Sequence, residues 1–598
     1  MNDSAAGLAD PLPVPVYTLT KARSQIVRLV ETQGLKVRPD EVRDVEAEVH
    51  ADLAVPLFRA AKDAGADPVA LARELASKLD LSHTLFRQVE AAQGYLNFRF
   101  NPVRFARSVV RDFQIEPEGY GKSTLGQGKT IVIDYSSPNI AKPFSVGHLR
   151  STVIGHSLHR ILSWLGYFLV GDNHLGDWGT QFGKLLEAWE IWGREELFKE
   201  HPTRYLLDLY VRFHEEAKVN PALDDRARDW FRRLENKDQA ATRVWRRFVE
   251  LSSAEFQRIY DLLGVEFDST LGESFYADRL EPLVRHALDR GVAKREHPLE
   301  PAGNGEDDVA RDERVVLIPL DSAGIDTPLI LQKSDGTSLY ATREIATAEY
   351  RIENWNPEQI LYVVGNEQTF YFRQFNAALR LLGRRTPCVH VSFGLVRLPE
   401  GRMSTREGRV VFLEDVIIEA IRRARRIVED RDMPDDEKEE LARIVGIGAI
   451  KYADLSQSRV KEVVFDWDKM LALDGDSAPY LQYAHTRCRS ILNKAGKPAL
   501  KSRPDPGLLI HPDEVELLRQ IARFPEAVLA AGTNHEPHRI AGRLYKLSQS
   551  FSSFYNNVPV LKADSQDLLR TRLYLVEMTG ATLRNGLWLL GIEVPDRM

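Results

Sequence analysis

Apolar and polar positions along the middle of the chain predict a parallel sheet covered by helices. The segment from Thr130 to Tyr135 (TIVIDY) is almost continuously apolar, which is typical of a strand buried on both faces. A helix is predicted to begin near Gly147, where apolar residues recur at steps of three and four. A second apolar segment, Tyr167 to Val170, leads into another loop and another helix. Strand, loop and helix, given twice, predict a doubly wound sheet.

The sheet is predicted to be interrupted by an insertion and then resumed. Residues from about 185 to 290 have the periodicity of amphipathic helices, and residues 295–314 are polar, acidic and loop-like. Strand-like segments return at Val315–Ile318, Leu329–Gln332 and Ile360–Val364. We therefore expect one sheet whose strands lie on both sides of a large insertion.

The two ends of the chain carry different patterns. Residues 1 to about 118 mix helical stretches with a short alternating segment, Gly94 to Phe100 (GYLNFRF), and a Gly-rich linker follows. Beyond about residue 412 the periodicity is helical, and its last part is typical of a helical bundle. A chain of 598 residues is too long for one core, so several domains are expected.

Composition narrows the class of protein. No apolar run approaches the roughly 18 residues of a membrane-spanning helix, and the N-terminus lacks the pattern of a signal peptide. Cys388 and Cys488 have no metal-ligand spacing, so we expect no zinc site, a reducing compartment and a cytoplasmic protein. The net charge of -7 does not indicate a nucleic-acid binder, but local basic faces would suffice for one. Arginine clusters near residues 232–247 and 422–426 are either such faces or solvated helix faces.

Two loops have the chemistry of a phosphate site. The first, Asn139 to Arg150 (NIAKPFSVGHLR), lies between a buried strand and a helix, where free amides, Lys142 and His148 could meet an anion. The second, Arg402 to Gly408 (RMSTREG), is basic and hydroxylated and would suit a mobile lid. Taken singly, the first is also compatible with an ordinary helix cap and the second with a generic surface loop.

Together the two loops resemble the paired signatures of class I aminoacyl-tRNA synthetases, in the right order around an insertion. The strings SSPNIAKPFSVGHLRST, NHLGDWGTQFG, LYATREIA and MSTREGRVV are similar to those of arginyl-tRNA synthetases, and the resemblance covers the whole chain. It implies an α/β class I synthetase fold with a Rossmann-like parallel sheet split by an insertion. It also implies an N-terminal α/β domain at 1–118 that binds the tRNA D-loop, and a catalytic domain at 119–412 with its insertion at about 185–325. A helical linker at 413–470 would contact the tRNA stem, and an all-α anticodon-binding bundle would occupy 471–598.

The resemblance also implies the catalytic residues. The expected set is Lys142, Ser145, Gly147, His148, Arg402, Met403, Ser404 and Arg406. His148, Lys142, Arg402 and Arg406 are expected to supply positive groups. Ser145 stands where the family has the first signature histidine, so a serine hydroxyl or a water is expected to cover that position. Arg402 and Thr405 replace two signature lysines, and Lys142 is expected to offset the loss.

An arginine pocket follows from the same resemblance. Its expected residues are Asn139, Glu273, Tyr340, Glu344 and Gln368. Glu273 and Glu344 would face the guanidinium with Tyr340 beside them, although the family usually has Asp at position 344. Asn139 and Gln368 would hold the backbone end or the pocket wall. Without the resemblance, each residue would be read as a surface carboxylate or a polar group at the edge of the core.

The implied reaction activates L-arginine with ATP and Mg²⁺ and transfers it to the 3′ end of tRNA(Arg), with tRNA needed even for the first step. Tyr95 and Asn97 are expected to contact the D-loop, although Tyr95 could simply pack in its strand. Tyr480, Tyr483 and Met598 are candidates for the anticodon side. The resemblance implies a monomer. The alternatives are a catalytically silent tRNA-binding or regulatory protein and a small-molecule adenylyltransferase, which would not need the long helical C-terminal region.

Overall fold

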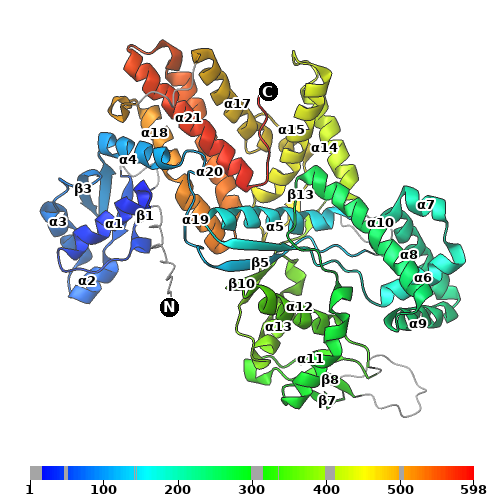
Figure 1. Ribbon diagram of the computed structural model, residues 1–598. Coiled ribbons are helices and arrows are strands. Elements are labelled where there is room, and N and C mark those ends of the chain that lie inside the picture. Colours follow the sequence, from blue (N-terminus) through cyan, green and yellow to red (C-terminus); the bar gives the residue numbers. More distant parts are fainter. Residues whose placement is uncertain are drawn as a thin grey trace, which may run out of the picture. The chain divides into compact units, whose positions relative to one another are not determined.

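The computed structural model describes residues 16–45, 51–140, 142, 144–297, 314–334, 336–397, 411–496 and 504–598 (Figure 1). The chain forms two units: residues 126–471 make one, and residues 1–125 together with 472–598 make the other. None of the helices in the described ranges is long and apolar enough to cross a membrane.

The unit of residues 126–471 is built on a four-stranded parallel sheet in the order β11-β10-β5-β6. After β5 the chain goes to β6 on one side and later returns to β10 on the other, so the topology switches direction beside β5. In open sheets of this kind, ligands bind at such a point, at the carboxyl ends of the strands. The strands are β5 (Thr130–Asp134), β6 (Phe168–Asp172), β10 (Gln359–Tyr362) and β11 (Cys388–His390).

The predicted strand and helix of the first motif are confirmed. Helix α5 (Val146–Trp164) follows β5 and packs closely against the residue directly after that strand. A Cβ atom at Gly155 would lie 2.2 Å from the side chain of Tyr135, so only glycine permits this approach. The close packing fixes the start of α5 at the carboxyl edge of the sheet.

Helices fill the predicted insertion, and in Figure 1 α6 to α10 form one group within this unit. They are α6 (Thr180–Trp192), α7 (Glu195–Glu200), α8 (Pro202–Val219), α9 (Ala222–Glu235) and α10 (Gln239–Leu263). The short helix η2 (Glu273–Tyr276) and α11 (Ala277–Asp289) complete the run.

One part of the sheet prediction is wrong. Val315–Ile318 and Leu329–Gln332 are strands, β8 and β9, but with β7 (Lys294–Glu296) they form a separate antiparallel sheet. Short apolar strands have the same sequence pattern in either kind of sheet, so periodicity could not assign them. This second sheet packs with α11, α12 (Tyr340–Trp355) and α13 (Thr369–Leu381) in a core that also contains Val132 and Ile360 of the parallel sheet.

The remainder of this unit is mostly helical, as predicted beyond residue 412. A two-stranded parallel ladder between β12 (Val396–Arg397) and β13 (Val463–Val464) is the exception. The helices are α14 (Leu413–Ile427), α15 (Asp435–Leu455) and α16 (Trp467–Met470).

The other unit combines both ends of the chain. Its N-terminal part is an antiparallel sheet in the order β1-β2-β4-β3, in which Leu96, Phe98 and Phe100 of β4 are buried, as the alternating segment predicts. Its C-terminal part is the predicted helical bundle. The two parts meet through contacts such as the ion pair between Arg23 Nε and Glu526 Oε1 at 2.9 Å.

The N-terminal elements are α1 (Thr18–Glu31), β1 (Arg43–Asp44), β2 (Leu53–Pro56), α2 (Phe58–Ala64), α3 (Pro68–Lys78), β3 (Phe86–Ala92), β4 (Tyr95–Phe100) and α4 (Pro102–Ile115). The bundle helices are α17 (Ala478–Ala495), α18 (Pro512–Ala522), α19 (Phe524–Asn534), α20 (His538–Asn557) and α21 (Gln566–Leu589).

Candidate active site

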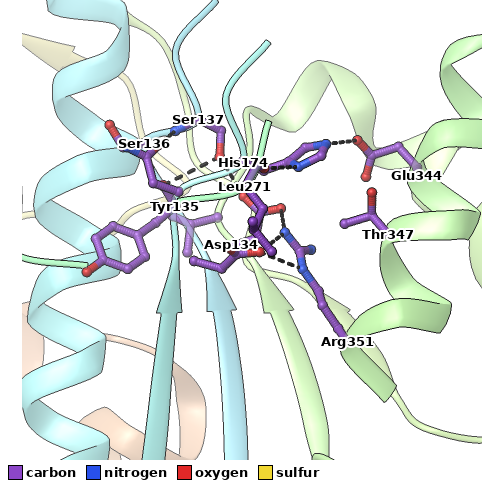
Figure 2. Close-up of polar contacts among 12 residues, drawn as sticks. Asp134, Tyr135, Ser136, Ser137, His174, Leu271, Glu344, Thr347 and Arg351 are labelled. Carbon is purple, nitrogen blue, oxygen red and sulfur yellow. Dashed lines mark hydrogen bonds and ion pairs between the residues drawn. The ribbon is translucent and has the colours of Figure 1, made fainter. Parts of the chain in front are cut away.

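A buried ion triad fixes helix α12 to the carboxyl ends of β5 and β6 (Figure 2). The Arg351 side chain is fully buried, and its Nη2 lies 2.7 Å from Oδ2 of both Asp134 and Asp172. Burial disfavours the charged form of Arg351, but the two carboxylates outweigh that effect and raise its pKa. The sequence interpretation missed this triad. Its signal was an aspartate at the end of each buried strand.

The predicted arginine-pocket carboxylates lie on two elements that the triad and a loop hold in place. Glu344 is on α12, seven residues and so two turns before Arg351, and is 3% exposed. Glu273 begins η2 and is 9% exposed. Tyr340, at the start of α12, hydrogen-bonds to Glu344 through its side chain. Tyr340 and Glu344 are therefore in contact, and Glu273 lies near enough to Glu344 for that carboxylate to raise its pKa.

The turn that carries Glu273 is fixed by the loop after β6. The Glu273 N–H donates to the Leu175 carbonyl at 3.0 Å, and the Ser274 N–H donates to Asp177 Oδ1 at 2.8 Å. A Cβ atom at Gly272 would lie 2.3 Å from Asp177 Oδ2, so the turn requires glycine there. The strings NHLGDWG and LGESF are thus parts of one substructure.

Glu273 already binds a guanidinium group within the chain. Nε of Arg343, one residue before Glu344, lies 3.0 Å from Oε2 of Glu273, and both side chains are largely buried. The sequence interpretation did not single out Arg343. This contact shows that the Glu273 carboxylate can pair with a planar cation that carries N–H donors.

Asn139 and Gln368 lie at the margins of this group. Asn139 Oδ1 accepts a hydrogen bond from Gln181 Nε2 at 3.2 Å, and the Asn139 backbone is bridged to Gly176. Gln368 ends η4 (Asn366–Gln368) and immediately precedes α13, whose Tyr371 ring is 5.3 Å from the ring of Tyr340. Both positions are compatible with a pocket wall.

The first signature forms the start of α5. Ser145 is the N-cap, and its N–H donates to Nδ1 of His148 at 3.1 Å. Because Nδ1 accepts, the proton of the neutral imidazole is on Nε2, where it can be donated to a ligand. Burial lowers the pKa of His148 to about 4, so at neutral pH this residue offers an N–H donor and not the positive group predicted from the resemblance. Lys142 is exposed in the preceding loop.

The second signature, with Arg402, Met403, Ser404 and Arg406, lies outside the described residues. The chain that follows it is held against the first signature. The Val146 N–H donates to the Val411 carbonyl at 3.2 Å, and the Leu413 N–H donates to the Phe144 carbonyl at 2.9 Å. Residues 411–413, which follow the second signature in the sequence, therefore lie beside the first signature.

The candidate tRNA contacts lie in the other unit. Tyr95 and Asn97 share the partly exposed face of β4, and the Tyr95 ring packs edge-on against Phe58 at 5.3 Å, so this tyrosine has a packing partner in its own domain. Tyr480 and Tyr483 lie on α17, where Tyr483 accepts a hydrogen bond from Arg487 at 2.6 Å. Tyr480 contacts Ser552 of α20 at 3.2 Å. Met598 is the partly buried C-terminal residue.

The clustered carboxylates predict a pH dependence. Burial raises the pKa of Glu273 and of Glu344. The carboxylate of Glu344 raises the pKa of Glu273 further, and Asp134 does the same for Glu344. A bound guanidinium favours the ionised forms, so protons and a guanidinium ligand compete. The apparent affinity for such a ligand should fall as the pH falls through these raised pKa values. Titration of ligand binding from weakly basic to weakly acidic pH checks this, and Glu344→Gln should flatten the profile. An equally steep profile in that variant would contradict the assignment.

Comparisons with known proteins match this arrangement. Residues 115–467 match the family described as tRNA synthetases class I (R), catalytic domain. Residues 481–598 match the DALR anticodon binding domain, and residues 19–100 match the arginyl tRNA synthetase N terminal domain. The arginine--tRNA ligase of Clostridium perfringens is 41% identical over 549 residues, covering 92% of this chain and 94% of the relative.

Two further relatives cover almost the full length. The arginine--tRNA ligase of Chloroflexus aurantiacus is 41% identical over 591 residues, which is 97% of this chain and 100% of that protein. The solved arginyl-tRNA synthetase of Thermus thermophilus superposes with a TM-score of 0.78 at 27% identity, covering 96% of this chain and 99% of that structure.

Proposed function

Because this chain belongs to the arginyl-tRNA synthetase family and is an arginine--tRNA ligase, we propose that its arginine pocket is the group formed by Glu273, Tyr340 and Glu344. The observation that carries the assignment is the ion pair between Glu273 and the guanidinium of Arg343, with Glu344 buried on the same helix. Asn139 and Gln368 form the wall of this pocket.

ATP, the family's second substrate, lies in our proposal at the start of α5. The backbone at Gly147 and the Nε2–H of His148 approach its phosphates or ribose in this proposal. Lys142, Arg402 and Arg406 supply positive charge, with Met403 and Ser404 in the same loop, and Ser145 holds the His148 ring. Among the described residues no group of three or more His, Cys, Asp or Glu side chains could hold a metal ion. Mg²⁺ would accompany the ATP, as the family resemblance implies, and would neutralise charge on its phosphates.

The chemistry proceeds in two displacements. An oxygen of the arginine carboxylate forms a bond to the α-phosphorus of ATP while the bond to pyrophosphate breaks. A ribose hydroxyl at the 3′ end of tRNA(Arg) then attacks the carbonyl carbon, and AMP leaves. The protein positions the reactants and stabilises the charge that develops on the phosphate oxygens. The match to the complete catalytic domain does not favour a catalytically silent protein.

In this proposal the region 1–118 binds the tRNA D-loop, 119–412 is the catalytic domain, 413–470 contacts the tRNA stem, and 471–598 binds the anticodon. In this proposal Tyr95 and Asn97 meet the D-loop, and Tyr480, Tyr483 and Met598 meet the anticodon side. The enzyme is proposed to act as a cytoplasmic monomer.

The role of His148 predicts a large rate effect from a small change. His148→Ala should lower the rate of arginyl-adenylate formation by roughly 10²–10³, the usual effect of losing one donor to developing charge. Binding of tRNA, measured by filter retention, should barely change. His159→Ala is the matched control, since His159 lies on the same helix and pairs with Asp268 outside the pocket. A near-parental rate for His148→Ala would show that the motif begins a helix and takes no part in the reaction.

The first step is expected to depend on tRNA. Arginine-dependent exchange of pyrophosphate into ATP should be absent from the protein alone and should appear when tRNA(Arg) is added. A tRNA of another specificity is the control. Robust exchange without any tRNA would contradict this part of the proposal.

A further inference from the structure

His174 lies two residues beyond the end of β6, and its ring points toward Glu344 (Figure 2). It is 6% exposed, and its ring packs against Tyr276 with the ring centroids 5.5 Å apart. Its Nδ1 is 3.1 Å from the Leu271 carbonyl oxygen. Nothing in the mechanism above uses this buried histidine.

The contact with Leu271 fixes the tautomer. A carbonyl oxygen accepts hydrogen bonds and cannot donate them, so Nδ1 carries a proton. In the tautomer with its proton on Nδ1, Nε2 presents a lone pair. Nε2 is buried and has no hydrogen-bond partner among the residues that the structure describes. A buried acceptor without a donor costs free energy, so a ligand that donates an N–H to Nε2 would be stabilised there.

The surroundings indicate which donor fits. Nε2 lies 3.8 Å from Oε1 of Glu344, so the two acceptors lie side by side. Glu273 and Asp177 add further carboxylates nearby. A group that satisfies this set must be cationic and must carry several N–H donors in fixed directions, which describes a guanidinium.

We propose that His174 is a further specificity-determining residue, whose Nε2 accepts one N–H of the bound arginine guanidinium beside Glu344. The inference rests on the proposed arginine pocket. Two carboxylates alone attract any cation, including the ammonium group of lysine. A lone pair held in one direction needs an N–H donor at one position. A shorter or differently shaped cation does not place a donor there.

The test replaces His174 by Phe, which keeps a ring against Tyr276 and removes both nitrogens. In tRNA arginylation the KM for arginine should rise about 10- to 100-fold, the range expected for losing one hydrogen bond to a charged group. The kcat and the KM for ATP should stay within about threefold. Agmatine, which carries the guanidinium without the carboxylate, should weaken as a competitive inhibitor by the same factor as arginine.

Two more variants separate contact from packing. His174→Gln retains an oxygen acceptor and should recover part of the arginine affinity, which also tests the idea should the Phe variant fold poorly. His159→Phe alters a histidine–carboxylate pair outside the pocket and should behave like the parent. The inference is overturned if the KM for arginine in His174→Phe equals that of the parent. It is also overturned if the KM values for arginine and ATP rise equally while inhibition by agmatine is unchanged. If the parent itself does not charge arginine, the pocket assignment fails instead.

Discussion

Glu273→Gln is expected to lower kcat/KM for arginine by roughly 30-fold to several-thousand-fold, because truncating one side of a buried charge pair costs about 2–5 kcal/mol. Glutamine keeps the shape of the side chain and removes the charge that faces the guanidinium. Burial raises the pKa of Glu273 and the nearby Arg343 lowers it, so a second guanidinium would favour the ionised form further. Steady-state arginylation with varied arginine measures the effect.

The controls for Glu273→Gln are built into the substrates and the chain. The KM for ATP should move far less, because the α-phosphate meets the other end of arginine. Citrulline, a neutral isostere, should be rejected less sharply by the variant than by the parent. Glu349→Gln alters a carboxylate on α12 that pairs with Arg384 at 3.0 Å and should leave arginine kinetics unchanged. Unchanged kinetics and selectivity in Glu273→Gln would make Glu344 the leading specificity residue.

Arg351→Met is expected to produce the largest loss of stability. It leaves the buried carboxylates of Asp134 and Asp172 without their cation, and breaking a buried pair in this way costs about 3–5 kcal/mol. Of the nine tryptophans only Trp588 lies outside residues 126–471, so tryptophan fluorescence follows the unfolding of that unit. Its thermal midpoint should fall by several degrees in the variant.

A surface pair provides the comparison for Arg351→Met. Arg279 is 42% exposed in its side chain and pairs with Glu353 at 2.9 Å, and Arg279→Met should cost no more than about 1 kcal/mol. Equal midpoints for the two variants would show that the triad does not fix α12 to the sheet.

The local sequence pattern predicted elements correctly where apolar runs and periodicity indicated the same kind of element. The run TIVIDY and the helix near Gly147 are β5 and α5 within a residue or two. Pattern was insufficient for Val315–Ile318 and Leu329–Gln332, because a short buried strand does not reveal whether its partner is parallel or antiparallel. That choice is made by tertiary packing with α11, α12 and α13.

The candidate site was predictable only in part for a related reason. Resemblance identified Glu273 and Glu344 one by one, and the structure groups them. The partners of Arg351 are 179 and 217 residues away in sequence, and no periodicity connects such positions. The orientation of His174 likewise depends on the Leu271 carbonyl, from a loop that follows the helical insertion. These contacts exist only once the split sheet has been assembled.

The most direct test of the central claim is attachment of amino acids to purified tRNA(Arg) by this protein in the presence of ATP, with each of the standard amino acids supplied alone. The account predicts that arginine is esterified to the 3′ end, with release of AMP and pyrophosphate, and that lysine and the other amino acids are not attached at a comparable rate. Failure to attach arginine, or comparable attachment of another amino acid, would contradict it.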